Sequence, residues 1–428
     1  MKVRLRVIFF LVFMVAFAYL LAKTITPYWT MVLLTLIFLY VGSIFFFIYY
    51  DFKDELNKTI KPWPTVSILI PNFNGEATVK KCVESCKAMR YPKKTEVIVV
   101  DDASTDNSYE ILKKISGIKL LRQKKNSGKA AALNRAIAES KGEIVACIDS
   151  DTYPSEDCLE KMVPLFAEKK VGAVTGLIRV HNPSNFLQRV QEIEYLIGFA
   201  FYQSMLSIIN AAFVTPGPMC LYRRQMLVES GGYDEENITE DMEIALRIQA
   251  SKYKIRACHN ASIYTEVPRG IRQWLKQRTR WYRGRVYNTW KYRHMLFNQE
   301  YGALGTFSFP ITFFLDFASV FVFFVISAML VDTLRYAILM ALAWAKVSAF
   351  PVLQAPVVII NSSAFFFYFV LICVFAFSTY FSFVIAKQKI SFKNIPPMLF
   401  IIFVYSVGVA FVWLYAFLNE LNRSEYKW

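Results

Sequence analysis

The chain has 428 residues, of which 55% are hydrophobic and only 19% charged, and it contains 38 Phe and 24 Tyr. A typical soluble domain is about 45–50% apolar and about 25% charged, so this composition excludes a disordered chain, a coiled coil and an ordinary cytosolic enzyme. The net charge is +16, and on so apolar a chain a basic balance is more typical of cytoplasmic membrane flanks than of nucleic-acid binding.

Two apolar segments open the chain. Val7–Ala22 is uncharged and flanked by cations, and Trp29–Tyr50 has 22 residues without a charge. A bilayer core needs about 20 apolar residues, so both segments are predicted to span a membrane. The alternative for the first is a signal peptide, because Ala16-Phe17-Ala18 resembles a cleavage site. In either case the second segment returns the chain to the cytoplasmic side.

Residues 51–300 contain no span-length apolar stretch and hold 29 of the 33 acidic residues. Short apolar runs predict strands, and segments with helical spacing alternate with them. The strands are expected at 65–71, 96–100, 118–121 and 143–148, and the helices at 77–89, 108–115 and 129–140. This alternation predicts an α/β domain with a parallel sheet covered on both faces. Ligands bind such sheets at the carboxyl ends of the strands.

Acidic residues follow two of the predicted strands, so they should share one crevice. Asp149-Ser150-Asp151 is a D-x-D sequence whose two carboxylates can hold a divalent cation together with phosphate oxygens and water. Asp101 and Asp102 can accept hydrogen bonds from a ring N–H or a ribose hydroxyl. The alternatives are solvated acids at a strand end for the first cluster and helix capping for the second.

Two further motifs are predicted at helix starts. Lys129 follows Asn126-Ser127-Gly128, where backbone N–H groups and a lysine suit an anion, the alternative being an ordinary surface lysine. Thr239 precedes a helical stretch as a candidate N-cap, with Glu240 and Asp241 in the first turn. That is a sufficient structural explanation, and the functional alternative is a general base.

Residues 269–293 hold nine Lys or Arg and no acid, interleaved with Trp and Tyr. This composition is compatible with single-stranded nucleic acid, with a sugar–diphosphate site or with a membrane interface. Within it, Arg280 can contact a phosphate in a bidentate manner, and Trp281 offers a flat face to a sugar ring.

The C-terminal region contains further apolar segments, at 303–330, 336–360, 364–386 and 395–418. The positive-inside rule favours keeping Lys387, Lys389 and Lys393 cytoplasmic, which requires that one segment does not cross. Residues 336–360 contain Lys346 and two prolines and suit an interfacial or re-entrant segment. We therefore predict five spans in total, with the N-terminus inside and the C-terminus outside; six is the alternative.

The motif order V-D-D-x-S, D-x-D, T-E-D, Q-x-x-R-W resembles the processive family-2 glycosyltransferases, the membrane synthases of cellulose, chitin, hyaluronan and poly-N-acetylglucosamine. The resemblance covers about Pro64–Tyr292 by motif and the remainder by layout. Gly217–Arg224 is similar to the G-P-x-x-x-Y-R-R sequence of hyaluronan synthases. Two departures are Ala103, where the family usually has Gly, and Pro71–Glu76, which differs from the usual P-x-Y-N-E.

The resemblance implies a GT-A fold, so the α/β domain is expected to be a cytosolic GT-A domain inserted between transmembrane helices. The expected boundaries are two N-terminal transmembrane helices in residues 1–50, the catalytic domain in 51–268 and basic, aromatic interfacial helices in 269–302. The remaining membrane region, 303–428, is expected to contain about three transmembrane helices and one re-entrant or interfacial segment.

The resemblance also implies roles for individual residues. Asp241, Glu240 and Arg280 are expected to be catalytic, with Asp241 as the base. Asp151 and Asp149 are expected to bind Mg²⁺ or Mn²⁺, and Trp281, Gly217 and Pro218 to bind the acceptor. The expected nucleotide-sugar contacts are Asn72, Asp101, Asp102 (the likelier uracil contact), Lys129, Asp149, Gln277 and Arg280.

The implied enzyme is a metal-dependent, inverting hexosyl or N-acetylhexosaminyl transferase of the plasma membrane. It would move a sugar from a UDP-sugar to a growing β-linked polysaccharide and translocate the product across the lipid bilayer. The alternative is a non-processive transferase with a membrane-lipid acceptor. Nucleic acid is not expected as a partner, because the carboxylate-bearing motifs would then be coincidental.

Overall fold

The computed structural model describes residues 59–314 and 362–422, with six isolated positions between 331 and 342. The predicted spans at 7–22 and 29–50 and most of the segment 336–360 lie outside the described residues. By its internal contacts the chain divides into two units. One comprises residues 45–312 and 378–401 and is called the sheet unit below; the other comprises residues 1–44, 313–377 and 402–428.

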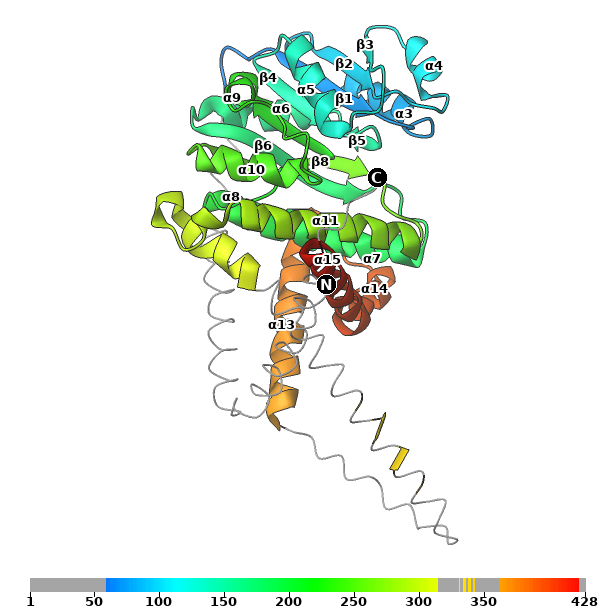
Figure 1. The fold of residues 1–428 in the computed structure, drawn as a ribbon, viewed down its shortest axis with the longest axis vertical. Coiled ribbons are helices and arrows are strands. Elements are labelled where there is room, and N and C mark those ends of the chain that lie inside the picture. The colour runs from blue at the N-terminus through cyan, green and yellow to red at the C-terminus, as the bar shows by residue number, and fades with distance from the viewer. Residues whose placement is uncertain are drawn as a thin grey trace. The chain divides into compact units, whose positions relative to one another are not determined.

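An eight-stranded sheet runs through the sheet unit in the order β3-β2-β1-β4-β7-β6-β8-β5 (Figure 1). The strands are β1 (Val66–Asn72), β2 (Glu96–Asp101), β3 (Lys119–Arg122), β4 (Ile144–Ile148), β5 (Thr152–Pro154), β6 (Val171–Val180), β7 (Met219–Arg223) and β8 (Lys254–Thr265). The four strands predicted from the sequence are β1 to β4, and they are parallel to their neighbours in the order β3-β2-β1-β4.

The expectation of a wholly parallel sheet is wrong, because the sheet is mixed. Strand β7 is antiparallel to both β4 and β6, and β5 is antiparallel to β8. These strands lack the signal that marked the first four. β5 has three residues, and β7 reads Met-Cys-Leu-Tyr-Arg, without the continuous β-branched runs of a parallel strand.

The helices and shorter helical turns of the sheet unit connect these strands and cover the sheet. They are α3 (Val79–Ala88), α4 (Ser108–Lys113), α5 (Lys129–Glu139), α6 (Cys158–Met162), η2 (Val163–Ala167), α7 (Phe186–Tyr195), η3 (Leu196–Tyr202), α8 (Gln203–Ile208), α9 (Arg224–Glu229), α10 (Glu240–Ala250), α11 (Ile271–Lys291), η4 (Arg293–Met295), η5 (Gln299–Tyr301) and η6 (Leu304–Ser308). Towards the C-terminus follow α13 (Ser362–Ile385), η7 (Phe392–Asn394), α14 (Ile395–Phe400), η8 (Ile401–Tyr405) and α15 (Ser406–Leu421).

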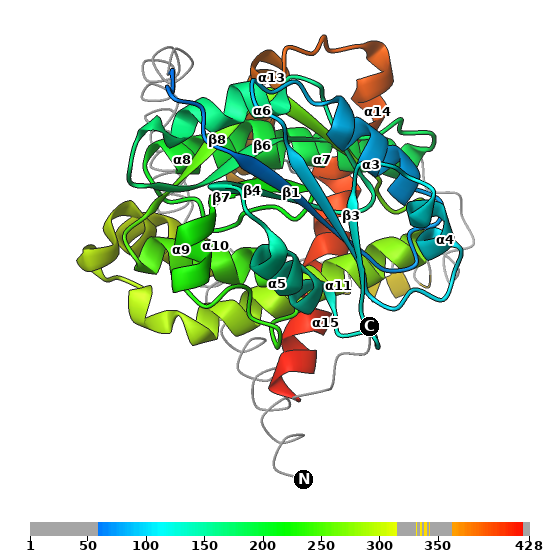
Figure 2. The same ribbon diagram turned by 90° about the horizontal axis from the view of Figure 1, so that it is seen from above.

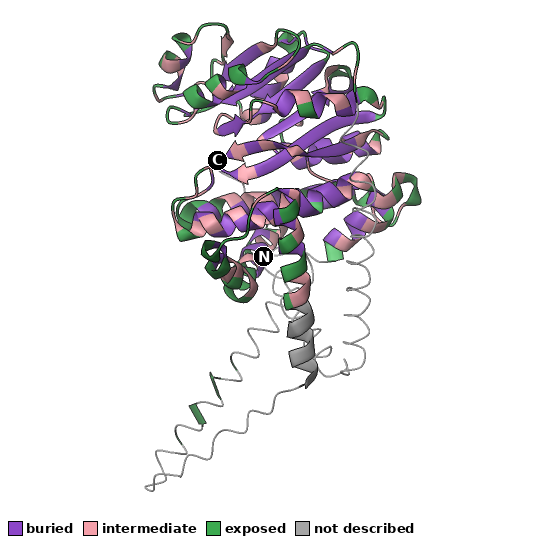
Figure 3. Cartoon of the chain, turned by 180° about the vertical axis from the view of Figure 1, so that it is seen from behind, coloured by how far each residue is buried: buried purple, intermediate pink, exposed green. Residues whose placement is uncertain are grey.

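Helices α3 and α5 cover opposite faces of the sheet (Figure 2). Alternate residues of β1 divide between them: Ile68 and Ile70 pack with α3, whereas Leu69 packs with α5. Side chains alternate along a strand, so a continuous apolar run such as β1 is buried on both faces. Figure 3 shows that the strands of the sheet are largely buried. Because β1, β2 and β4 are parallel, the loops that follow them meet at one edge of the sheet.

Helices α7 and α8 are joined by a π-helical segment, Leu196–Tyr202. Residues 378–401 pack against it within the same unit. Phe383 and Ala386 join a buried cluster with residues of β6, α7 and the π-helical segment. The Arg179 guanidinium donates to the carbonyl of Ala386. The loop that follows α13 therefore packs against β6 and α7 within the sheet unit.

One helical stretch in the described part of the chain, Phe392–Leu421, is long and apolar enough to cross a membrane. Two shorter apolar helical stretches are Leu304–Phe314 and Ile372–Ile385. Phe392–Leu421 contains the segment predicted as a span at 395–418, and the two shorter stretches lie in the segments predicted at 303–330 and 364–386.

Ala103 has a backbone φ of +58°, the left-handed conformation that glycine adopts freely. This conformation costs an L-residue about 1–2 kcal/mol. A Gly at this position, as is usual in the resembled family, would avoid that cost. Its greater conformational freedom in the unfolded chain would lower the free energy of unfolding by about 0.4–1 kcal/mol and so cancel part of the gain.

Ala103→Gly is therefore expected to raise the free energy of unfolding by up to about 1 kcal/mol, measured by thermal or denaturant unfolding in detergent. Ala138→Gly is the matched control. Ala138 is exposed near the end of α5, where the same substitution is expected to lower stability by up to about 1 kcal/mol. A lower stability of Ala103→Gly than of the parent protein would contradict the assigned conformation.

Candidate functional site

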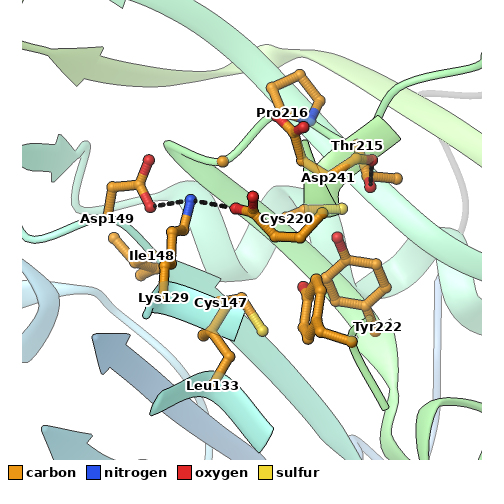
Figure 4. Close-up of a pocket in the computed structure, with 13 residues that line it drawn as sticks. Lys129, Leu133, Cys147, Ile148, Asp149, Thr215, Pro216, Cys220, Tyr222 and Asp241 are labelled. Atoms are coloured by element: carbon orange, nitrogen blue, oxygen red, sulfur yellow. Dashed lines mark hydrogen bonds and ion pairs between the residues drawn. The ribbon is translucent and has the colours of Figure 1, made fainter. Parts of the chain in front are cut away.

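Lys129 lies between two carboxylates from different parts of the chain (Figure 4). Its Nζ is 2.6 Å from Asp149 Oδ1 and 2.8 Å from Glu240 Oε1. Asp149 follows β4 and Glu240 opens α10, so one ammonium joins two motifs that are about ninety residues apart in the sequence. Burial lowers the pKa of Lys129, but Asp149, Glu240 and Asp241 outweigh that effect and raise it, so the lysine is charged.

The loop before α5 positions Lys129, and Asp102 holds that loop. Asp102 Oδ1 accepts from the backbone N–H of Ser127 at 2.9 Å, and Oδ2 accepts from that of Gly128 at 2.8 Å. Gln123 Nε2 also donates to Asp102 Oδ1, at 2.9 Å. Gly128 has a φ of +91°, which a residue with a side chain rarely adopts. In this structure the carboxylate expected to contact the nucleobase therefore anchors the turn that presents Lys129.

Gly217 lies directly against the Lys129–Asp149 ion pair. A Cβ at this position would lie 2.7 Å from Lys129 Nζ and 2.8 Å from Asp149 Oδ2, so a larger residue would have to displace the ends of these two side chains. The next residue, Pro218, accepts at its carbonyl from the backbone N–H of Asp149 at 3.3 Å. Both residues are expected from the resemblance to bind the acceptor, and in the structure they lie against Asp149.

Asp241 lies beside this cluster and lines the same small pocket. Its backbone carbonyl accepts from both the N–H and the hydroxyl of Thr215, at 3.1 and 2.8 Å. Burial, and then the neighbouring Glu240, raise the pKa of Asp241 to about 6. Glu240 is different: burial raises its pKa, but Lys129 and Arg280 together hold it below its usual range. At neutral pH both carboxyls are ionised, and Asp241 is the more basic.

Asp151, the second acid of the D-x-D sequence, carries a carboxyl whose pKa is raised to about 7, first by burial and then by the charge of Asp149. Two carboxylates that repel one another are relieved by a divalent cation. No cluster of three or more His, Cys, Asp or Glu side chains suited to a metal occurs among the residues with described positions. Two carboxylates nevertheless suit Mg²⁺ or Mn²⁺, because Mg²⁺ takes oxygen ligands and usually keeps waters and substrate phosphates as the others.

The Q-x-x-R-W residues lie along α11, which runs beside α7 and α10. Arg280 Nη1 donates to the carbonyl of Ile238 at 3.1 Å, and its charge lowers the pKa values of Glu240 and Asp241. The guanidinium therefore faces the acidic cluster. Gln277 Oε1 is buried, and within the described ranges no hydrogen-bond partner is found for it.

Trp281 is half-buried and is held by an arginine that the sequence did not single out. The Arg278 guanidinium lies 4.3 Å from the Trp281 ring centroid, and its Nη2 is 2.7 Å from Glu194 Oε2 of α7. Tyr195 lies 6.5 Å from the Trp281 ring. Arg278 thus links α7 to the aromatic side chain expected to bind the acceptor.

Asn72 and Asp101, expected to contact the nucleoside, are buried and bond to one another. Asn72 Nδ2 donates to Asp101 Oδ1 at 3.1 Å and to Ser104 Oγ at 3.3 Å. Asp101 also pairs with Arg122 Nε at 3.3 Å. In this structure the two side chains hold the turn after β2, next to the Asp102 turn.

Sequence reasoning missed three groups of residues that shape the site. Thr215 fixes the carbonyl of Asp241, and Tyr222 and Tyr233 line the pocket under the charged residues. Gly284 and Asn288 of α11 pack against Thr239. Thr239 is the residue before α10, as expected, but its side chain makes no capping bond and accepts from Asn288 instead. The available signal was Gly284, a glycine inside a predicted helix.

Comparison with known proteins is consistent with this arrangement. Residues 67–231 match the family model of Glycosyl transferase family 2. The poly-beta-1,6-N-acetyl-D-glucosamine synthase of Staphylococcus aureus (strain COL) is 30% identical over 252 residues, which are 57% of this chain and 61% of the relative. That of Staphylococcus epidermidis is 32% identical over the same lengths. The chain thus matches about three fifths of the length of these curated relatives.

Among solved structures, a mannosyltransferase from Pyrobaculum calidifontis, determined with GDP-Man and Mn²⁺, has a similar fold. The TM-score is 0.58 at 20% sequence identity, and the match covers 94% of this chain and all of that one. At this identity the likeness concerns the fold.

Gly217→Ala is expected to separate Lys129 from Asp149, because the added methyl would need the space of both charged groups. We expect turnover of a nucleotide-sugar to fall about tenfold or more, since a small displacement at a reacting centre can cost about 10²-fold. Thermal unfolding should change little, because both contacts are ends of flexible side chains. Gly270→Ala, where nothing lies within 4 Å, is the control. Unchanged turnover in Gly217→Ala would contradict the role of this contact.

Proposed function

We propose that this chain, which carries a family-2 glycosyltransferase domain in residues 67–231, transfers a sugar from a UDP-sugar to an acceptor hydroxyl with inversion at the anomeric carbon. The observation that carries the proposal is the pocket in which Lys129, Asp149, Glu240 and Asp241 meet. The family domain contributes Lys129 and Asp149, and α10 contributes the two acids beyond it.

Asp241 is the residue best suited to act as the general base. It is half-buried, ionised above about pH 6 and more basic than Glu240, which is paired with Lys129. A base with a pKa near the working pH is efficient. Asp241 accepts the proton of the acceptor hydroxyl as that oxygen attacks the anomeric carbon from the face opposite the leaving diphosphate. A single base on one face requires no covalent intermediate, so an α-linked donor gives a β-linked product.

Cations on the other side of the reacting centre stabilise the departing diphosphate. Arg280 faces the acidic cluster and can donate two parallel hydrogen bonds to phosphate oxygens. Lys129 offsets one of the two negative charges of Asp149 and Glu240, which reduces their repulsion of a polyanionic donor. Asp149 and Asp151 would hold Mg²⁺ or Mn²⁺, which when bound supplies positive charge to the diphosphate oxygens.

The donor and product are proposed from the relatives. Both staphylococcal relatives are named for synthesis of poly-beta-1,6-N-acetyl-D-glucosamine. We therefore favour an N-acetylhexosamine as the sugar, a growing β-linked polysaccharide as the acceptor and translocation of the product across the membrane. Trp281, held by Arg278 and beside Tyr195, would supply the flat face for an acceptor ring.

The packing of residues 378–401 supports the proposed five-span topology. The carbonyl of Ala386 contacts Arg179, and Gln388 Nε2 donates to Glu192 Oε1 at 3.4 Å, so this loop lies on the side of the membrane that holds the sheet unit. An even number of crossings must then separate residue 302 from Lys387. Two crossings, by 303–330 and 364–386, satisfy this requirement when 336–360 does not cross. Nucleotide-sugars are cytosolic, so that side is the cytoplasm.

A donor panel tests the function. Purified full-length protein is incubated with UDP-GlcNAc, UDP-Glc, UDP-GlcA and GDP-Man with Mg²⁺ or Mn²⁺, and nucleotide release and product length are read together. We expect UDP release with UDP-GlcNAc and a β-linked polymer. A single monoglycosylated lipid would overturn the polymer assignment, and no release from any nucleotide-sugar would overturn the transferase assignment.

Asp241→Asn is expected to retain donor binding and lose about 10²–10⁴-fold in transfer rate, because the amide cannot accept the hydroxyl proton. Donor affinity is measured by titration calorimetry with UDP, and transfer by product formation. Asp157→Asn, a surface acid paired with Lys161, is the control and should transfer at the parent rate. Residual transfer within a few fold of the parent rate in Asp241→Asn would contradict its role as base.

The topology predicts from which side of the membrane an impermeant reagent can reach each loop. A cysteine at exposed Lys389 should react with an impermeant maleimide only from the cytoplasmic side, and one at Thr333 only from outside. Six of the native cysteines are buried, so only Cys373 needs replacement with Ser. Labelling of Lys389→Cys from outside in intact cells would contradict the five-span arrangement.

A further inference from the structure

The face of α11 that points at α10 carries a regular stripe of residues. Arg280, Gly284 and Asn288 are four residues apart and therefore lie on one face of the helix. Each of them contacts residues 237–239, the segment that leads into the T-E-D sequence. Arg280 donates to the carbonyl of Ile238, Gly284 lies against Thr239, and Asn288 bonds to both Asn237 and Thr239.

Three buried polar side chains form the centre of this contact. Asn237 Nδ2 donates to Asn288 Oδ1 at 2.8 Å, and Asn288 Nδ2 donates to Thr239 Oγ1 at 3.0 Å and to Asn237 Oδ1 at 3.3 Å. The backbone N–H of Thr239 donates to Asn237 Oδ1 at 3.1 Å. All three residues are at most 4% exposed. Their separation from water makes each bond costly to lose, so the contact has one defined geometry.

Gly284 explains how the helices come close enough for these bonds. A Cβ on Gly284 would lie 2.1 Å from Thr239 Oγ1 and 2.3 Å from its Cγ2. Glycine inside a helix costs roughly 0.5–1 kcal/mol relative to alanine, and here it provides the close approach of α11 to Thr239. Thr239 in turn gives its hydroxyl to Asn288 rather than capping α10.

Two turns of α11 thus link the diphosphate side of the site to its base side. In an inverting transfer the base and the leaving group lie on opposite faces of the anomeric carbon, so the distance between Asp241 and Arg280 has to be fixed. Arg280 belongs to α11, and Asp241 comes two residues after Thr239. A rigid contact between Asn288 and Thr239 fixes that distance without touching the substrate.

We propose that Asn288 is a positioning residue that, through Thr239 and with Gly284 as its contact point, sets the general base Asp241 in line with Arg280. This inference rests on the proposed function, in which Asp241 is the base. It assigns a mechanical role to a helix whose Q-x-x-R-W residues would bind substrate directly.

The test uses the full-length protein and compares Asn288→Leu, Thr239→Val and the double variant. Both single substitutions keep the approximate shape of the side chain and remove the Asn288–Thr239 hydrogen bond from opposite ends; Asn288→Leu also removes the bonds to Asn237. We expect kcat to fall about tenfold or more in each, with the donor KM within about twofold of the parent value. Because Asn288→Leu already breaks the contact that Thr239→Val breaks, the double variant should lose no more than Asn288→Leu alone.

Tyr287→Leu is the matched control, because Tyr287 precedes Asn288 but is 45% exposed. Its kcat should equal that of the parent protein. Thermal unfolding shows which variants are folded; if Asn288→Leu does not fold, the kcat of Thr239→Val decides alone. Folded variants with the parent kcat, or losses that multiply in the double variant, would overturn the positioning role. An inactive parent protein would instead overturn the proposed function.

Discussion

The ion pairs of Lys129 with Asp149 and Glu240 are the constraint on which the rest of the site depends. Several carboxylates lie in or beside one pocket and would repel one another, and the half-buried ammonium of Lys129 offsets part of that repulsion. Residues around Lys129 hold it in this position. Asp102 fixes the turn before it, Gly128 provides the backbone conformation of that turn, and Gly217 leaves room for the ion pair with Asp149.

This arrangement separates the roles of the two acids that open α10. Glu240 is paired with Lys129, so its pKa is lowered despite burial. Asp241 keeps a raised pKa, because burial and Glu240 outweigh the same cations. Adjacent carboxyls with pKa values pushed in opposite directions suit a structural role and a proton-accepting role, respectively. Helix α11 then holds this segment through contacts two turns beyond Arg280.

Much of the first half of the sheet unit could be predicted from the sequence. Strands β1, β2 and β4 are apolar runs that are largely buried on both faces, and acidic residues stand at the ends of β2 and β4. Strands β5 to β8 were not predicted, because β5 has only three residues and polar residues such as Arg256 and His259 interrupt the apolar pattern of β8. Motif spacing identified Lys129, Asp149, Glu240 and Asp241, which the structure brings together. It did not reveal Thr215, Arg278 or Asn288, since single polar residues in helices and loops carry no period and their partners are distant in sequence.

The measurement that tests the central claim most directly is the pH dependence of kcat for sugar transfer with saturating donor and metal. If Asp241 is the base, it must be ionised to accept the hydroxyl proton, so kcat should rise with pH through a single step near pH 6 and then level off. A rate that stays constant between about pH 5 and 8, or that rises as the pH falls, would contradict the account.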